Sequence, residues 1–166
     1  IKLIRAYWTD EEVNFQGEFY TANAMAMEPK SPQGSKLPIW IGGTSKAALR
    51  RVAELGDGWL ATAIEDVDVA KSFIQRIHEH AESIGRNPNE IGMQMMLDVP
   101  PRDEAGKQFY KHADNVLARA DAVKSAGFEW GALNATAMFQ AGYKSVDALI
   151  DQLAVLHDAL RAHLGK

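Results

Sequence analysis

Short apolar runs alternate with amphipathic helical patterns four times along this sequence, and this alternation constrains the fold more than any other feature. The runs cover residues 39–41, 58–62, 93–99 and 130–134. Each run is too short for a helix, is bounded by Gly or Pro, and lacks strict alternation, which is typical of strands buried on both faces. Repeated strand and helix units predict a parallel sheet with right-handed crossovers, either closed into a barrel or doubly wound.

The helices that follow these runs are predicted from apolar residues at spacings of three and four. We expect one between Ser45 and Gly56, a second over about 66–84, a third over about 104–125 and a fourth that opens at Ser145. Gly85 is placed to end the second helix. Ser145 is a good N-cap residue, because its hydroxyl can accept a bond from a free N–H of the first turn.

The first forty residues do not follow this rhythm. A short helical piece ends near Trp8, and Gly17 then separates two apolar and aromatic stretches. A segment rich in Pro, Gly and Ser leads on to Pro38. We therefore expect residues 11–37 to form a hairpin-like surface insertion.

Composition excludes several classes of partner. The net charge of −4 and the pI near 5.7 offer no basic field for a nucleic acid. No apolar run approaches the roughly 20 residues of a membrane span, and no signal peptide is visible, so we expect a cytoplasmic protein. The absence of Cys excludes disulfides and thiolate chemistry. Because the chain opens without Met inside a helical pattern, we expect a fragment or a processed product.

One motif points to a binding site. The run PIWIGGTSK places Gly42, Gly43, Thr44 and Ser45 between the first strand and its helix. Glycines let a ligand approach the backbone, and the free N–H groups of a helix start favour an anion such as phosphate. An ordinary capped turn remains the alternative, because the sequence contains no G-x-G-x-x-G and no Walker motif.

Other polar and apolar candidates are given structural roles or no chemical role. The five His residues fall on predicted helices without a metal-ligand spacing, so we expect no metal site. The acidic residues 65, 66 and 68 fit a helix start, whereas Trp40, Trp59 and the methionines at 93, 95 and 96 fit core packing. The following residues come after predicted strands and are candidates for substrate contact, without an assigned catalytic step: Asp98, Arg102, Asp103, Asn134 and Thr136.

Five linked motifs within the first sixty residues carry a family resemblance. They are W-T at 8–9, F-x-G-x-F-Y at 15–20, a Pro-rich approach at 29–38, P-I-W-I-G-G at 38–43 and G-D-G-W at 56–59. This order resembles the bacterial luciferase-like flavin and F420-dependent oxidoreductases. The resemblance implies that residues 1–166 are the carboxyl-terminal half of a TIM (β/α)8 barrel.

The same resemblance implies a function for the glycine motif. Gly42, Gly43, Thr44 and Ser45 would hold the phosphate of FMN or coenzyme F420 in an oxidoreductase or monooxygenase with a small-molecule substrate. Because the family's amino-terminal half supplies most ring contacts, we expect the chain alone to be inactive. We also expect it to associate with a second copy or with the missing half. A non-catalytic half-barrel scaffold, or a sugar-phosphate barrel without a cofactor, remains an alternative.

Overall fold

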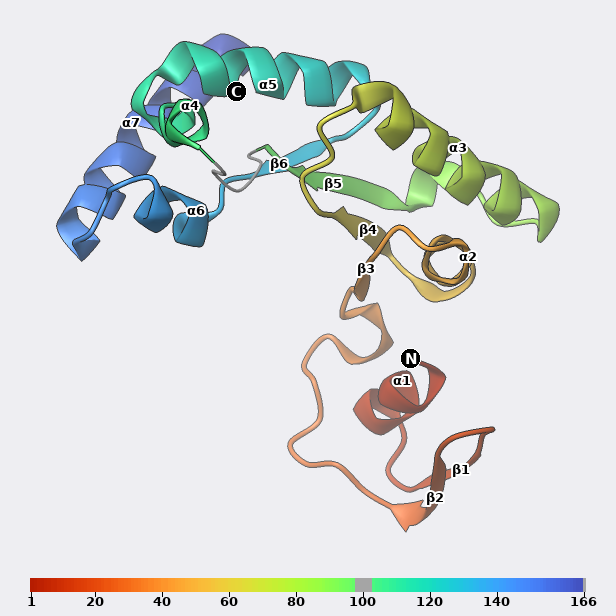
Figure 1. Cartoon of the computed structure of the whole chain (residues 1–166). Coiled ribbons are helices and arrows are strands. Elements are labelled where there is room, and N and C mark those ends of the chain that lie inside the picture. Colours follow the sequence, from red (N-terminus) through yellow and green to blue (C-terminus); the bar gives the residue numbers. More distant parts are fainter. Residues whose placement is uncertain (98–102, 166) are drawn as a thin grey trace. The chain divides into compact units, whose positions relative to one another are not determined.

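The computed structural model of this protein describes residues 1–97 and 103–165 (Figure 1). The chain divides into two compact units, one formed by residues 1–39 and the other by the rest of the chain from Trp40. The second unit contains the parallel sheet, and the first contains a short helix and a hairpin.

The sheet of the second unit has four parallel strands in the order of the sequence. They are β3 (Trp40–Gly42), β4 (Gly58–Ala61), β5 (Gly92–Met96) and β6 (Trp130–Ala132). The register aligns Ile41 with Trp59 and Trp59 with Met93. The predicted parallel α/β sheet is confirmed. Of the predicted run 93–99, residues 98 and 99 lie outside the described residues.

Three of the four long helices begin at residues that the sequence predicted, and α5 does not. The four helices are α2 (Lys46–Leu55), α3 (Val67–Ser83), α5 (Ala113–Ser125) and α7 (Val146–Leu164). Ser145 Oγ accepts a hydrogen bond from the N–H of Ala148 at 3.2 Å, which confirms the predicted start of α7. Gly85 follows α3 with a φ of +75°, a conformation that glycine adopts at little cost.

The single helix predicted over 104–125 is wrong, because the structure divides this segment. It contains α4 (Glu104–Lys107), the 3-10 turn η3 (Phe109–Lys111) and α5. The break lets Tyr110 enter the core, where its side chain is 1% exposed. Its carbonyl accepts bonds from Gln152 Nε2 at 2.6 Å and from the Tyr143 hydroxyl at 3.3 Å. These tertiary contacts offset the lost helical bonds, and periodicity along one segment does not report them.

Three shorter elements were not predicted. The helix α6 (Ala135–Gln140) follows β6 and is capped by Asn134, whose side chain accepts from the N–H of Thr136 at 2.9 Å. The 3-10 turns are η1 (Gly34–Lys36) and η2 (Pro88–Glu90).

The helices cover one face of the sheet, and the main core lies between them (Figure 1). Trp59 is fully buried at its centre, with its ring edge-on to Phe73 and tilted against Phe128. Neighbouring core side chains come from the strands and from the inner faces of α2, α3 and α5: Val52, Ala53, Ala61, Ile77, Met93, Met95 and Val116.

No described helix of the second unit covers the opposite face of the sheet (Figure 1). At its amino end, the Trp40 ring lies across Gly58 and Gly92, where an added Cβ would come within 2.4 Å and 2.6 Å of ring atoms. Further along the strands, Leu60 and Trp130 are 39% and 60% exposed. This face corresponds to the interior of a closed barrel, and β3 and β6 form the two outer edges of the sheet.

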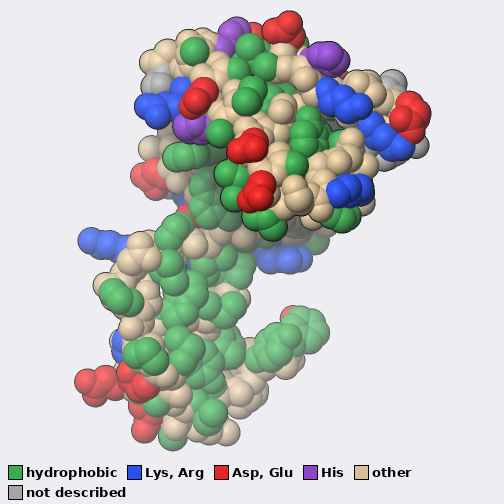
Figure 2. Space-filling view, turned by 90° about the vertical axis from the view of Figure 1, so that its left-hand side faces the viewer, with side chains coloured by type: hydrophobic (Ala, Val, Ile, Leu, Met, Phe, Trp, Pro, Cys, Tyr) green, Lys and Arg blue, Asp and Glu red, His purple; other side chains and the backbone are tan. Residues whose placement is uncertain are grey.

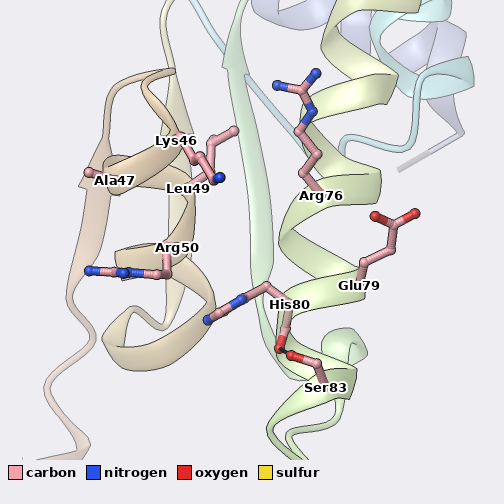
Figure 3. Close-up of a pocket in the computed structure, with 8 residues that line it drawn as sticks. All are labelled: Lys46, Ala47, Leu49, Arg50, Arg76, Glu79, His80 and Ser83. Carbon is pink, nitrogen blue, oxygen red and sulfur yellow. Dashed lines mark hydrogen bonds between the residues drawn. The ribbon is translucent and has the colours of Figure 1, made fainter.

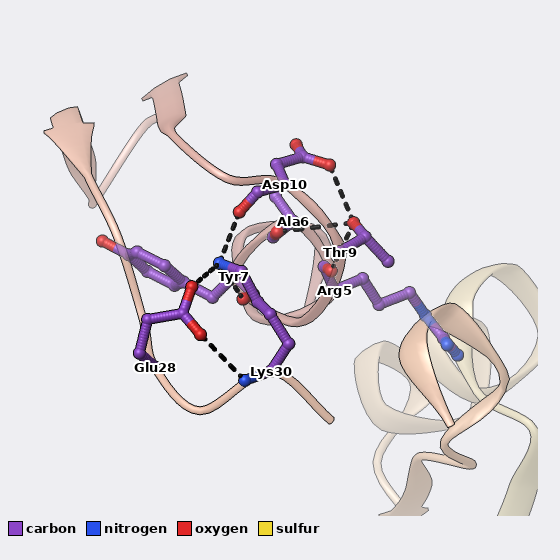
Figure 4. Close-up of polar contacts among 7 residues, drawn as sticks. All are labelled: Arg5, Ala6, Tyr7, Thr9, Asp10, Glu28 and Lys30. Carbon is purple, nitrogen blue, oxygen red and sulfur yellow. Dashed lines mark hydrogen bonds and ion pairs between the residues drawn. The ribbon is translucent and has the colours of Figure 1, made fainter. Parts of the chain in front are cut away.

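The first unit contains α1 (Lys2–Thr9), an antiparallel hairpin of β1 (Val13–Gln16) and β2 (Thr21–Met25), and the turn η1. Lys30 closes the carboxyl end of α1, where the helix dipole favours a cation. Its Nζ donates to the Asp10 carbonyl at 2.6 Å and lies 3.5 Å from the Glu28 carboxylate (Figure 4).

Apolar side chains also gather on the surface of the first unit, in the lower part of Figure 2. Phe19 and Tyr20, between the two strands of the hairpin, are 79% and 71% exposed. Apolar patches of this kind often mark a surface that other protein covers.

Candidate functional site

The turn from β3 into α2 brings together the four residues predicted to bind an anion. Gly42 ends the strand, and Gly43, Thr44 and Ser45 follow it on the exposed carboxyl edge of the sheet. Gly43 has a φ of +101°, and a Cβ there would lie 3.1 Å from the Ala48 Cβ. Both the conformation and the close approach require glycine at position 43.

Backbone donors at this turn are free to bind a ligand. The Ser45 hydroxyl accepts a hydrogen bond from the N–H of Ala48 at 3.2 Å and so caps α2. The N–H groups of Thr44, Lys46 and Ala47 have no acceptor within the described parts of the chain. Because unpaired N–H groups and the positive end of the helix dipole lie together, the turn suits a negatively charged group.

The residues present therefore fit a phosphate group. Gly42 and Gly43 carry no side chain over the turn, and the Thr44 hydroxyl is exposed. Lys46 is the first residue of α2 and adds a positive charge (Figure 3). No carboxylate forms an ion pair with Lys46 among the described residues, so its charge is available to a ligand.

Trp59 contacts this turn from the core side of the sheet. Its indole Nε1 donates a hydrogen bond to the Gly43 carbonyl oxygen at 2.9 Å. The sequence suggested only a packing role for Trp59, which its burial confirms. The additional hydrogen bond was not predictable, because it depends on the position of β4 beside β3.

Arg119 of α5 connects the loops after β4 and β5. Its guanidinium donates to the carbonyl oxygens of Leu97 at 3.2 Å, of Glu65 at 3.1 Å and of Ile64. Partial burial lowers the pKa of Arg119, and the nearby Glu65 carboxylate opposes that shift. Arg119 thus fixes the carboxyl edge of the sheet, where barrel enzymes carry their functional loops. Arg119 was not among the residues predicted from the sequence, where its only signal is a cation within a predicted amphipathic helix.

Several of the remaining predicted candidates have structural roles. Asp66 caps α3 by accepting from the N–H groups of Asp68 and Val69, which confirms the predicted acidic helix start. Asp103 Oδ1 accepts from the N–H of Gly106 at 2.7 Å. Asp98 and Arg102 lie outside the described residues.

The histidines are not grouped as metal ligands. His80 contacts Glu54 at 3.0 Å, and His163 contacts Asp121 at 2.9 Å. His157 lies 3.3 Å from Asp158, and His112 precedes α5 without a side-chain capping bond. Within residues 1–97 and 103–165, no three His, Asp or Glu side chains gather as a potential metal site.

A groove runs between the outer sides of α2 and α3 (Figure 3). It has a volume of about 930 Å³ and is lined by Lys46, Ala47, Leu49, Arg50, Arg76, Glu79, His80 and Ser83. Arg50 and His80 both contact Glu54, so the Arg50 charge in the groove already has a carboxylate partner. The lining includes Lys46 and Ala47 but not Gly42 to Ser45, so the groove adjoins the glycine turn without containing it.

A parallel α/β sheet with helices on one face and loops at its carboxyl edge is the arrangement of part of a (β/α)8 barrel. Comparison with known proteins specifies the family. Residues 1–148 match the family described as luciferase-like monooxygenase. The chain belongs to this family.

Relatives within the family use two different cofactors. The F420-dependent glucose-6-phosphate dehydrogenase of Mycolicibacterium gilvum is 25% identical over 100 residues, which are 60% of this chain and 29% of that enzyme. The FMNH2-dependent dimethylsulfone monooxygenase of Pseudomonas putida is 24% identical over 165 residues, which are 99% of this chain and 44% of that enzyme. The chain thus spans less than half the length of these relatives.

A solved structure confirms the fold. An F420-dependent secondary alcohol dehydrogenase, in complex with an F420-acetone adduct, superposes with a TM-score of 0.72 at 17% identity. The match covers 96% of this chain and 59% of that enzyme, so the chain has the fold of part of a luciferase-like barrel. No helix among the described residues is long and apolar enough to cross a membrane.

Proposed function

We propose that this chain supplies the cofactor-phosphate site of an oxidoreductase or monooxygenase that uses FMN or coenzyme F420 and acts on a small molecule. The observation that carries the proposal is the turn at Gly43, whose positive φ accompanies free N–H groups at Thr44, Lys46 and Ala47. Membership of the luciferase-like family supports the choice of a flavin or deazaflavin over other phosphorylated ligands.

The roles of the residues follow from their chemistry. The backbone N–H groups of the turn would donate to phosphate oxygens, and Lys46 would balance part of the charge. The exposed Thr44 hydroxyl would add a neutral donor. When bound, the flavin or deazaflavin ring supplies hydride transfer, and this part of the protein anchors the tail and orients it.

The experiment compares Gly43→Ala with the wild-type chain. Alanine is strained at a φ of +101°, and its Cβ would press on Ala48. Strain of about 1–3 kcal/mol corresponds to roughly 5- to 150-fold in affinity if binding requires this conformation. We expect Gly43→Ala to weaken FMN binding by about tenfold, measured by quenching of flavin fluorescence, without affecting riboflavin, which lacks the phosphate.

Gly85→Ala is the matched control. Gly85 also has a positive φ, +75°, but lies at the end of α3 with no atom within 4 Å of an added Cβ. It imposes backbone strain away from the turn and should leave FMN affinity unchanged. If the wild-type chain binds FMN no better than riboflavin, the phosphate site is wrong. A parallel titration with F420 decides which cofactor binds more tightly.

We also propose that the chain associates through its open sheet, with a second copy as the partner in solution. Two halves of four parallel strands, each with β3 at one edge and β6 at the other, can pair edge to edge and close a barrel of eight strands. The exposed Trp130 and a hollow of about 440 Å³ beside β6, lined by α5 and α7 residues, favour a covered edge. The same observation favours a non-catalytic scaffold as the second candidate function.

A further inference from the structure

We propose that Trp59 is a positioning residue of the phosphate site, because its indole N–H fixes the direction of the peptide group between Gly43 and Thr44. The observation is the hydrogen bond of 2.9 Å from Trp59 Nε1 to the Gly43 carbonyl oxygen. The inference rests on the proposed function of the turn and adds a residue from the neighbouring strand β4, whose side chain is fully buried.

The indole is held rigidly on the core side of the sheet. Trp59 is fully buried, and its ring centroid lies 6.0 Å from that of Phe73 and 5.6 Å from that of Phe128. Phe73 contacts it edge-on, at an interplanar angle of 85°. A ring confined in this way presents Nε1 at a fixed position, so the hydrogen bond constrains Gly43 and not the reverse.

The constraint on the carbonyl determines where the next N–H points. In a trans peptide group the C=O and the N–H lie in one plane and point in opposite directions. Because the Gly43 oxygen points toward Trp59 in the core, the N–H of Thr44 points toward the exposed side of the turn. This N–H has no acceptor in the described part of the chain.

Loss of the indole donor would release this orientation. Gly43 has the most permissive backbone of any residue, so without the hydrogen bond the peptide group can rotate and the Thr44 N–H can turn away. Binding of a phosphate would then have to order the peptide group, and the entropy lost would reduce the binding free energy. Trp59 thus contributes to affinity for the phosphate by preorganising one of its donors.

The test uses the ¹⁵N-labelled chain and two probes, ribitol 5-phosphate and ribitol, which differ only in the phosphate. In the wild-type chain we expect ribitol 5-phosphate, but not ribitol, to shift the amide resonances of Thr44, Lys46 and Ala47. Trp59→Phe keeps an aromatic ring and removes the donor. Replacement of Trp59 by benzothienylalanine keeps the bicyclic shape and puts sulfur in place of the N–H. Both should raise the dissociation constant for ribitol 5-phosphate about three- to tenfold, as expected for one lost hydrogen bond.

Leu156→Val is the control, because it truncates a buried side chain of α7 that is not one of the rings packed around Trp59. It should change the dissociation constant less than about twofold, even where the stability falls as for other core truncations. If both variants without the donor bind ribitol 5-phosphate as the wild type does, the role of Trp59 is wrong and the phosphate site stands. If the wild-type amides do not respond to ribitol 5-phosphate, the phosphate site itself is wrong.

Discussion

The contact of Trp40 with two glycines can be tested by adding a single methyl group. In Gly58→Ala the new Cβ would lie 2.4, 2.5 and 2.7 Å from three atoms of the Trp40 ring. Real Cβ contacts lie more than 3.0 Å apart, so the ring must move by most of an ångström or leave its place. The backbone of β4 is paired on both sides and has little freedom to move instead.

The expected cost follows from this overlap. Overpacking a filled site typically costs about 1–3 kcal/mol, and Trp40 can relieve part of it because its outer side is only partly buried. We therefore expect Gly58→Ala to lower the free energy of unfolding by about 1–2 kcal/mol. Gly92→Ala should behave alike, because its Cβ would lie 2.6 Å from the same ring.

The assay is a double-mutant cycle measured by urea unfolding of the chain. Trp40→Ala removes the ring, so adding Gly58→Ala to it should cost less than about 0.5 kcal/mol, and the coupling energy should be about 1–2 kcal/mol. A cycle with additive costs would show that the loss arises in the strand backbone. The packing explanation would then be wrong.

Two further predictions concern the helix that carries the glycine turn and the open sheet. Arg86 donates to the carbonyls of Val52, Ala53 and Gly56 at 3.3, 2.9 and 2.6 Å and so caps the carboxyl end of α2. Arg86→Met should lower the free energy of unfolding, measured by urea denaturation, by about 2 kcal/mol. A change below about 0.5 kcal/mol would contradict the capping role. Sedimentation velocity should show the wild-type chain as a dimer and Trp130→Lys as a folded monomer, whereas a wild-type chain that stays monomeric at high concentration would exclude association of two copies.

The order of strands and helices was predictable because it depends on the spacing of apolar residues that are close in the sequence. The short apolar runs bounded by Gly or Pro form β3 to β6. Ser45, Asp66 and Ser145 cap α2, α3 and α7 in turn. Caps and periodicity involve residues within one or two turns of each other, so they can be recognised in the sequence without the rest of the fold. The division of the segment 104–125 was not predictable, because it depends on contacts of Tyr110 with residues more than thirty positions away.

The sequence by itself determined the class of fold, the family and the four residues of the glycine turn, since the motifs and the helix cap are local. Only the tertiary structure decided how that turn is supported. Trp59 and Gly43 are separated by sixteen positions, and Arg119 lies more than fifty from Ile64 and Glu65. Both side chains donate to backbone carbonyls that strand pairing and helix packing bring beside them. Because every residue has a backbone carbonyl, the sequence does not indicate which one will accept such a bond.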